Sequence, residues 1–216
     1  MWRFIGALSL LPACSGGQDG PIVLDEAFDR LVVDVDGGHV ALSATTDGSA
    51  AVSRTVEKGG QKVSLAWDLA DGTLWLSAAC EKADPAGCDV VHTIDVPAEV
   101  AVEVRVGVGG VEGWALAGPV DVGVGEGAVH LTWSSSPHLV AVVGAGDVTV
   151  DAVSVGAIDV TVGQGAAELL VPQGTYAVDA WVGEGTVEVS GVLDDPSAAA
   201  SLAARSGAGS VTVAGY

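Results

Sequence analysis

The chain has 216 residues, of which 31 are glycine and 49% are hydrophobic, and this length is enough for one domain with a substantial core. The abundance of valine and glycine and the near absence of helix-forming stretches predict an all-β fold. With 28 acidic residues against 8 basic ones the formal charge is −20, which excludes nucleic acids and anionic membrane surfaces as partners bound through charge.

The amino terminus has the features of an export signal. Arg3 precedes an apolar run over residues 4–11 that is too short to span a bilayer, and Leu-Pro-Ala-Cys follows, ending at Cys14. This resembles a bacterial lipoprotein signal. The resemblance implies a signal peptide over residues 1–13, a lipidated Cys14 with a flexible tether over 14–27, and attachment to the bacterial outer membrane on its periplasmic or cell-surface face. In the alternative interpretation, residues 4–11 form a buried strand.

An irregular, strand-rich part follows over residues 28–98, where runs at 31–36 and 39–42 flank a Gly-Gly pair. Cys80 and Cys88 bracket a polar loop between expected strands at 73–78 and 89–96. In an oxidising compartment, with Cys14 carrying lipid, we expect Cys80 and Cys88 to form a disulfide that links the two strands. The alternative is a metal site, but no further Cys or His lies at ligand spacing.

A repeated pattern occupies residues 102–189: an alternating apolar run, Gly-x-Gly, and a second alternating run. The first glycines are separated by 18, 19, 19, 20 and 24 residues and are Gly107, Gly125, Gly144, Gly163, Gly183 and, in a degenerate copy, Gly207. A constant period indicates stacked repeats, and alternation with period two indicates strands. The three alternate residues before each of the first five glycines, such as Val102, Val104 and Val106, are all apolar.

We therefore expect a single-stranded, right-handed β-helix (β-solenoid) with about 19 residues per rung. Its N-terminal part would span residues 28–98, and regular rungs with a C-terminal cap would span 99–216. Only residues 196–205 could form a short helix. Ordinary hairpins in a β-sandwich are the alternative.

The order of an irregular strand-rich part, the segment Ile94-Asp95-Val96-Pro97 and rungs with Gly-x-Gly resembles a group of bacterial proteins. These are adhesin-like proteins of unknown function built from β-strand repeats, including autotransporter-adhesin head domains. The resemblance covers about residues 28–213. It implies a β-helix outside the cytoplasm with a role in adhesion, and it carries no catalytic residues.

The chain contains no G-x-S-x-G elbow, Walker loop or H-E-x-x-H motif, so we expect no enzyme activity, no cofactor and no defined metal site. One set of candidate site residues remains, on the outer faces of the rungs. Stacked carboxylates would form a face that binds Ca²⁺ weakly or contacts a cationic ligand. A solvated acidic face is the alternative. The residues are Glu103, Asp121, Asp159 and Asp179 with Trp181, and Glu112, Glu168 and Glu188.

Together these features predict a non-enzymatic, lipid-anchored cell-envelope protein that acts as an adhesin-like interaction protein or a surface scaffold. Its partners would be the membrane, through the lipid, and a cell-surface glycan or protein. One alternative is a carbohydrate-binding or carbohydrate-active β-helix, because Trp181 is expected to point outward beside Asp179, and Trp75 to point outward between Leu74 and Leu76. Another is a polymerising scaffold like the bactofilins, which share the rung length.

Overall fold

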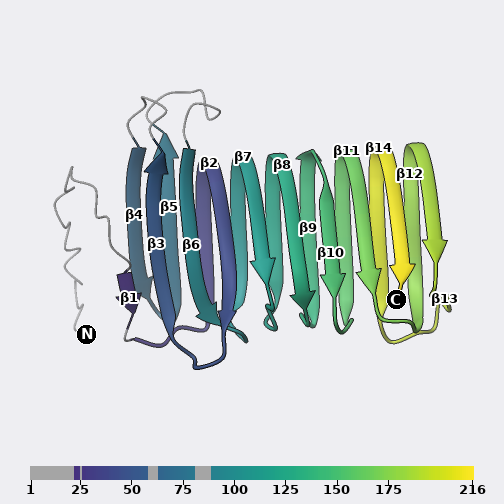
Figure 1. Cartoon of the computed structure of the whole chain (residues 1–216), viewed down its shortest axis with the longest axis horizontal. Helices are drawn as coiled ribbons and strands as arrows, with labels where there is room; N and C mark the ends of the chain where they lie inside the picture. Colours follow the sequence, from purple (N-terminus) through teal and green to yellow (C-terminus); the bar gives the residue numbers. More distant parts are fainter. Residues whose placement is uncertain (1–21, 25, 58–62, 81–88) are drawn as a thin grey trace, which may run out of the picture.

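The computed structural model describes residues 22–24, 26–57, 63–80 and 89–216 (Figure 1). These ranges contain 14 strands in one large mixed sheet and no helix, so the prediction of an all-β fold is confirmed. Nothing in them could cross a membrane as a helix. The expected short helix at 196–205 is wrong, because strand β14 begins at Ser201. Cys14 and the predicted signal peptide lie outside the described residues.

The strands vary from 2 to 16 residues in length. They are β1 (Ile22–Leu24), β2 (Arg30–Thr45), β3 (Ala50–Glu57), β4 (Val63–Ala70), β5 (Thr73–Cys80), β6 (Asp89–Pro97), β7 (Ala101–Trp114), β8 (Val120–Ser134), β9 (His138–Ala145), β10 (Val148–Ala152), β11 (Ala157–Val171), β12 (Thr175–Ser190), β13 (Leu193–Asp194) and β14 (Ser201–Gly215).

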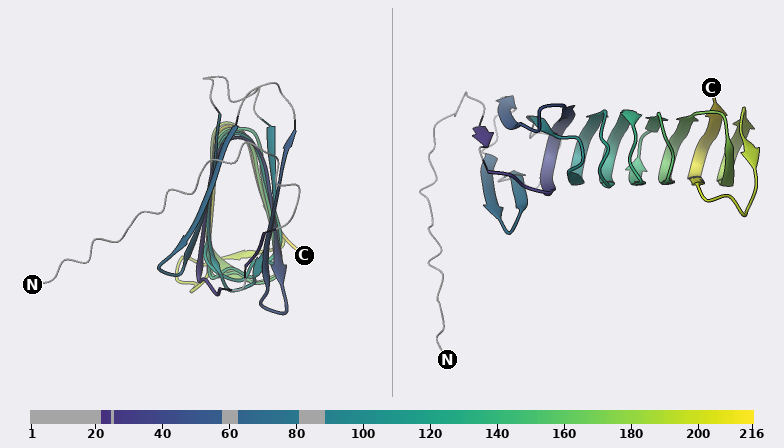
Figure 2. Two further views of the ribbon diagram at one scale, coloured as in Figure 1. Left: turned by 90° about the vertical axis from the view of Figure 1, so that its left-hand side faces the viewer. Right: turned by 90° about the horizontal axis from the view of Figure 1, so that it is seen from below.

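Each long strand bends at its Gly-x-Gly and contributes to two walls. We call the halves before this bend the first wall and the halves after it the second wall. Seen along the long axis, the strands outline an elongated ring around the core (Figure 2). At the bend, Gly127 has φ +143° and a Cβ there would lie 1.5 Å from the carbonyl oxygen of Gly109 on the neighbouring strand. Only glycine allows the backbones to approach this closely.

Neighbouring repeats pair in parallel and in register. Val102 of β7 is paired with Val120 of β8, and Val120 with Leu139 of β9. Because side chains alternate along a strand, every second residue of each half points into the ring. The core is therefore made of ladders of aliphatic residues, such as Val104, Val122, Ala141, Val160 and Ala204, all fully buried.

Two strands lie out of chain order. The first, β14, lies between β11 and β12, paired in parallel with both. The second, β2, lies between β7 on one side and the pair β5 and β6 on the other. The expectation that successive copies stack in chain order is therefore correct from β7 to β11 and wrong for the last copy. The outermost long strand at that end is β12, and the end of the chain is internal (Figure 1).

The other end of the molecule is built from antiparallel strands. β4 pairs antiparallel with β5, and β3 pairs antiparallel with β6 and with β1. At the end of β5, the backbone N–H of Cys80 donates a hydrogen bond to Asp36 Oδ2 at 2.8 Å. Cys88 lies outside the described residues, so its disulfide with Cys80 stays a prediction.

One ionisable side chain interrupts the aliphatic core near this end. His92 of β6 is fully buried, and neither ring nitrogen has a hydrogen-bond partner among the described residues. Its neighbour in register is Arg54 of β3. Burial, and secondarily the charge of Arg54, lower the pKa of His92 to about 4. The imidazole is therefore neutral in the folded protein at neutral pH.

Candidate interaction surfaces

The carboxylates predicted for the first wall form ion pairs with arginines. Arg105 Nη2 lies 3.0 Å from Asp121 Oδ2 and 3.6 Å from Glu103 Oε1. Arg30 Nη2 lies 2.6 Å from the other oxygen of Glu103. These two acids therefore already have basic partners, which weakens their expected role as cation ligands.

A third arginine, Arg205, pairs with the acids at the far end of the wall. The insertion of β14 places Ala203 between Asp159 and Asp179 in register, so these two acids are not neighbours. Arg205 of β14 reaches both, with Nη1 3.1 Å from Asp159 Oδ1 and Nη2 2.6 Å from Asp179 Oδ2. The hydrogen bond with Asp179 is the main reason that the pKa of Arg205 is raised.

The acids predicted for the second wall are also kept apart. Their row runs Glu112, His130, Thr149, Glu168, Thr212, Glu188. The threonine of β14 separates Glu168 from Glu188, just as Ala203 separates the acids of the first wall. Among the described residues, no group of three His, Cys, Asp or Glu side chains could hold a metal ion.

Trp75 and Trp181 are both exposed, as the sequence predicts, but the structure does not bring them together. Trp75 lies on β5 and Trp181 on β12, at opposite ends of the sheet. Trp181 is the register neighbour of Arg205. Neither residue has another aromatic ring stacked on it among the described residues, so each is an isolated surface tryptophan.

An aromatic pair on the second wall was not predicted from the sequence. Trp114 of β7 and Trp133 of β8 stack with ring centroids 5.3 Å apart and an interplanar angle of 25°. Both remain exposed, by 48% and 57%. Trp133 has φ +57°, and the register between β8 and β10 shifts at this level. The bulge turns Trp133 out of the regular alternation, and for this reason the period-two pattern did not place it beside Trp114.

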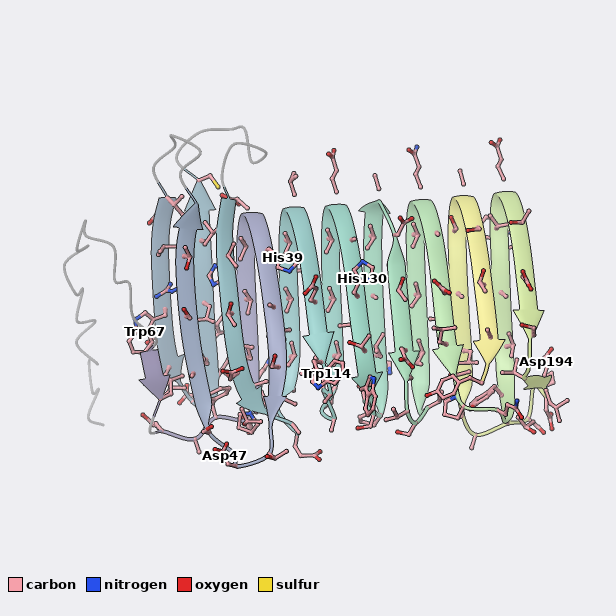
Figure 3. The ribbon with its side chains drawn as sticks, in the orientation of Figure 1. His39, Asp47, Trp67, Trp114, His130 and Asp194 are labelled. Carbon is pink, nitrogen blue, oxygen red and sulfur yellow. The ribbon has the colours of Figure 1, made fainter. Side chains whose placement is uncertain are left out.

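A shallow depression of about 180 Å³ lies beside this pair. Its lining includes Ala41, Ser43, Glu112, Trp114, His130 and Thr132. His39 Nε2 lies 3.7 Å from Glu112 Oε1 at its edge. Trp114 lies toward one edge of the wall, with His39 and His130 further along the strands (Figure 3). The depression thus combines an aromatic surface with a carboxylate, an imidazole and two hydroxyls, which suits a ligand that is partly apolar and rich in hydrogen-bonding groups.

No protein-family model and no curated protein matches the chain. Among solved structures, a protein named as a candidate cell adhesion protein from Clostridium sporogenes has a TM-score of 0.52 and 10% identity, covering 91% of this chain and 99% of that one. Candidate adhesins from Bacteroides fragilis (TM-score 0.41, 13% identity, 90% and 95% covered) and Parabacteroides merdae (0.29, 11%, 88% and 94%) are similar at a lower level. The first of these shows a shared fold.

Proposed function

We propose that the chain is a lipid-anchored, extracytoplasmic β-solenoid that acts as a non-enzymatic, adhesin-like interaction protein. The parallel, in-register pairing from β7 to β11 supports a solenoid with about 19 residues per rung. A right-handed coil is proposed because crossovers between parallel strands are almost always right-handed. The shared fold with a protein named for cell adhesion supports the role, and the sequence up to Cys14 supports the lipid anchor at the outer membrane.

The exposure of the tryptophans is the observation that supports a role in binding a partner. Every tryptophan that the structure describes is exposed, while the core consists mainly of Val, Leu, Ile and Ala, with Phe28 and Tyr176 as its buried Phe and Tyr among the described residues. Tryptophan is highly buried on average in folded proteins and is enriched where binding energy concentrates at interfaces. Large aromatic surface left in water therefore favours contact with a partner. The exposed fractions are 45% for Trp67, 50% for Trp75, 48% for Trp114, 57% for Trp133 and 55% for Trp181.

We further propose that the depression beside Trp114 and Trp133 binds a cell-surface glycan. A sugar ring has an apolar C–H face that packs on an indole ring, and hydroxyls at its rim that need polar partners. Glu112 would accept hydrogen bonds from such hydroxyls, and Ser43 and Thr132 could donate or accept. This observation makes carbohydrate binding the second candidate function, at the Trp114–Trp133 pair rather than at Trp75 or Trp181.

The location is tested by protease treatment of intact cells, with lysed cells as the control. We expect cleavage on intact cells, and loss of membrane association when Cys14 is replaced by Ser. Protection until lysis would overturn the adhesin role and leave a periplasmic scaffold. Membrane association that survives the Cys14→Ser change would contradict the lipid anchor.

Glycan binding is tested with the purified protein on an array of bacterial and host polysaccharides, followed by titration calorimetry with the best binder. Trp114→Ala should weaken binding by about tenfold or more, because it removes the aromatic ring that lines the depression. Trp133→Ala should weaken binding less, because this ring contributes through its stacking on Trp114. Trp75→Ala, which removes an equally exposed tryptophan elsewhere, is the matched control and should bind as the wild type does. Equal loss in all three variants, or no binding of any polysaccharide, would contradict the proposed site.

A further inference from the structure

The arginines of the described residues avoid the outer face of the second wall. Arg30, Arg105 and Arg205 all lie on the first-wall halves of their strands, where they form ion pairs with carboxylates. Arg54 of β3 is paired in register with the buried His92, so it points into the ring. Among the described residues, which include no lysine, the outer face of the second wall therefore carries neither arginine nor lysine.

Glu112, in the lining of the depression, is consequently not neutralised in the way that the first-wall acids are. Its side chain is 62% exposed, and the imidazole that lies 3.7 Å from its Oε1, that of His39, forms an ion pair only when it is protonated. None of the other residues that line the depression has a carboxylate, arginine or lysine side chain. The depression therefore presents a single carboxylate to a ligand.

This charge pattern discriminates between classes of glycan. A uronic or sialic acid would bring a second carboxylate next to Glu112, in a chain whose formal charge is already −20. A neutral sugar would gain hydrogen bonds from the carboxylate and nothing more. A sugar with a free amino group would place an ammonium against the carboxylate and gain a charge-assisted hydrogen bond.

The spacing of Glu112 and Trp114 suits such a sugar. The two residues are two positions apart on β7 and both are exposed, so their Cα atoms lie about 7 Å apart with the side chains on the same face. Both line the depression. A pyranose ring that packs its C–H face on the indole can therefore direct an amino substituent toward the carboxylate. An ammonium close to the indole is also attracted to the negative face of that ring.

We propose that the glycan bound at this depression is a polymer of hexosamines with free amino groups, and that Glu112 selects it by pairing with an ammonium. This inference rests on the proposed glycan binding and names the class of sugar that the same site takes. The negative charge of the whole chain supports it, because a field of that sign raises the local concentration of a polycation. Amino groups repeated along the polymer give each glycan chain several opportunities to bind.

Titration calorimetry of the purified full chain with three tetrasaccharides of the same linkage tests this selection. The oligomers are those of glucosamine, N-acetylglucosamine and glucose, which carry an amino group, a neutral amide and a hydroxyl at the same carbon. At slightly acidic pH, where the amino groups are charged, we expect the glucosamine oligomer to bind about fivefold more tightly than the other two, as is typical of a solvent-exposed ion pair. Raising the salt from about 0.05 M to about 0.5 M should remove most of this preference.

Two variants assign the preference to one carboxylate. Glu112→Gln keeps the shape of the side chain and removes its charge, so it should bind all three oligomers about as tightly as the wild type binds the neutral ones. This retained binding shows that the site is intact. Glu184→Gln, which removes the same charge from the exposed bend of β12, is the matched control and should keep the full preference.

The possible failures of this inference and of the glycan site are distinguishable. Equal affinity of the wild type for the three oligomers would overturn selection by charge and leave glycan binding in place. A preference that survives in Glu112→Gln would belong to the overall charge of the chain and would overturn the role of Glu112. Tighter binding of a galacturonic acid tetrasaccharide would also contradict the inference. A lack of binding to every glycan, these and those on the array, would contradict the proposed glycan site itself and the inference with it.

Discussion

The guanidinium of Arg205 lies 2.6 Å from the carboxylate of Asp179, which is 26 positions earlier in the chain. The contact exists because β14 returns from beyond β12 and enters the sheet next to β11. From there the same side chain reaches Asp159 on the other side at 3.1 Å. Arg205 on β14 therefore forms ion pairs with both of its neighbours, β11 and β12. Without β14 between them, the acids of β11 and β12 would lie side by side and repel each other.

We expect Arg205→Gln to lower the free energy of unfolding by about 1 kcal/mol, a modest value because partly exposed ion pairs are screened by water. Urea denaturation measures the change. The loss should shrink at about 1 M salt, where charges are screened over about 3 Å. Arg205→Lys keeps the charge but not the fork that reaches both acids, and it should lie between the wild type and Arg205→Gln. A loss unaffected by salt would show that packing, and not charge, is responsible.

Because His92 is buried and neutral, we expect the stability of the folded protein to fall at acidic pH. Its pKa is lowered from 6.5 to about 4 in the folded state, so between these values the unfolded chain binds more protons than the folded one. The free energy of unfolding should therefore fall by about 3 kcal/mol as the pH drops from about 6.5 to about 4. His92→Leu should lose this part of the pH dependence, measured as the difference from the wild type in denaturation at several pH values. A constant difference across that range would contradict the buried neutral imidazole.

A comparison of Gly127 with Gly48 tests whether the bends require glycine because the strands approach each other closely. Both have positive φ, but a Cβ at Gly127 would collide with the carbonyl oxygen of Gly109, while at Gly48 no atom lies within 4 Å. Gly127→Ala should cost about 3 kcal/mol or more, and Gly48→Ala about 1 kcal/mol from backbone strain alone. Chemical denaturation distinguishes them. Similar losses would mean that close approach of the strands is not what requires glycine at the bend.

The stacking of Trp114 on Trp133 should be measurable without a ligand. A double-mutant cycle with Trp114→Ala and Trp133→Ala should give a coupling free energy of about 1 kcal/mol, typical of an aromatic pair. The two single changes should each destabilise only mildly, because both rings are about half exposed. A coupling near zero would show that the rings do not hold each other in place, which would weaken the case for a preformed binding surface.

Local patterns in the sequence predict which residues face the core. Val102, Val104 and Val106 and their counterparts in the next three copies are all buried, as the period-two alternation predicts. In the last regular copy, Val178, Ala180 and Val182 are only partly buried. Alternation reports the direction of a side chain, which is a local property of a strand. It does not report whether another strand covers that direction.

Spatial order between strands is not encoded in a repeat that is nearly the same in every copy. The position of β14 depends on the loop from 191 to 200 and on pairs such as Arg205 with Asp159, which no spacing rule predicts. The arrangement of the candidate site residues could not be predicted from their spacing either. The acids at the predicted positions exist, but interleaved strands separate Asp159 from Asp179 and Glu168 from Glu188. The Trp114–Trp133 pair depends on a bulge that breaks the alternation.

The interleaving of β14 also changes what a shortened chain would be. In a simple stack, losing the final repeat removes an end layer and leaves a smaller version of the same protein. Here, losing Ser201–Gly215 takes away a middle layer, separates β12 from β11 and uncovers the valine ladder of both. A copy that lacked this strand would therefore expose its interior and be open to degradation, so the last strand along the chain holds the layers before it together.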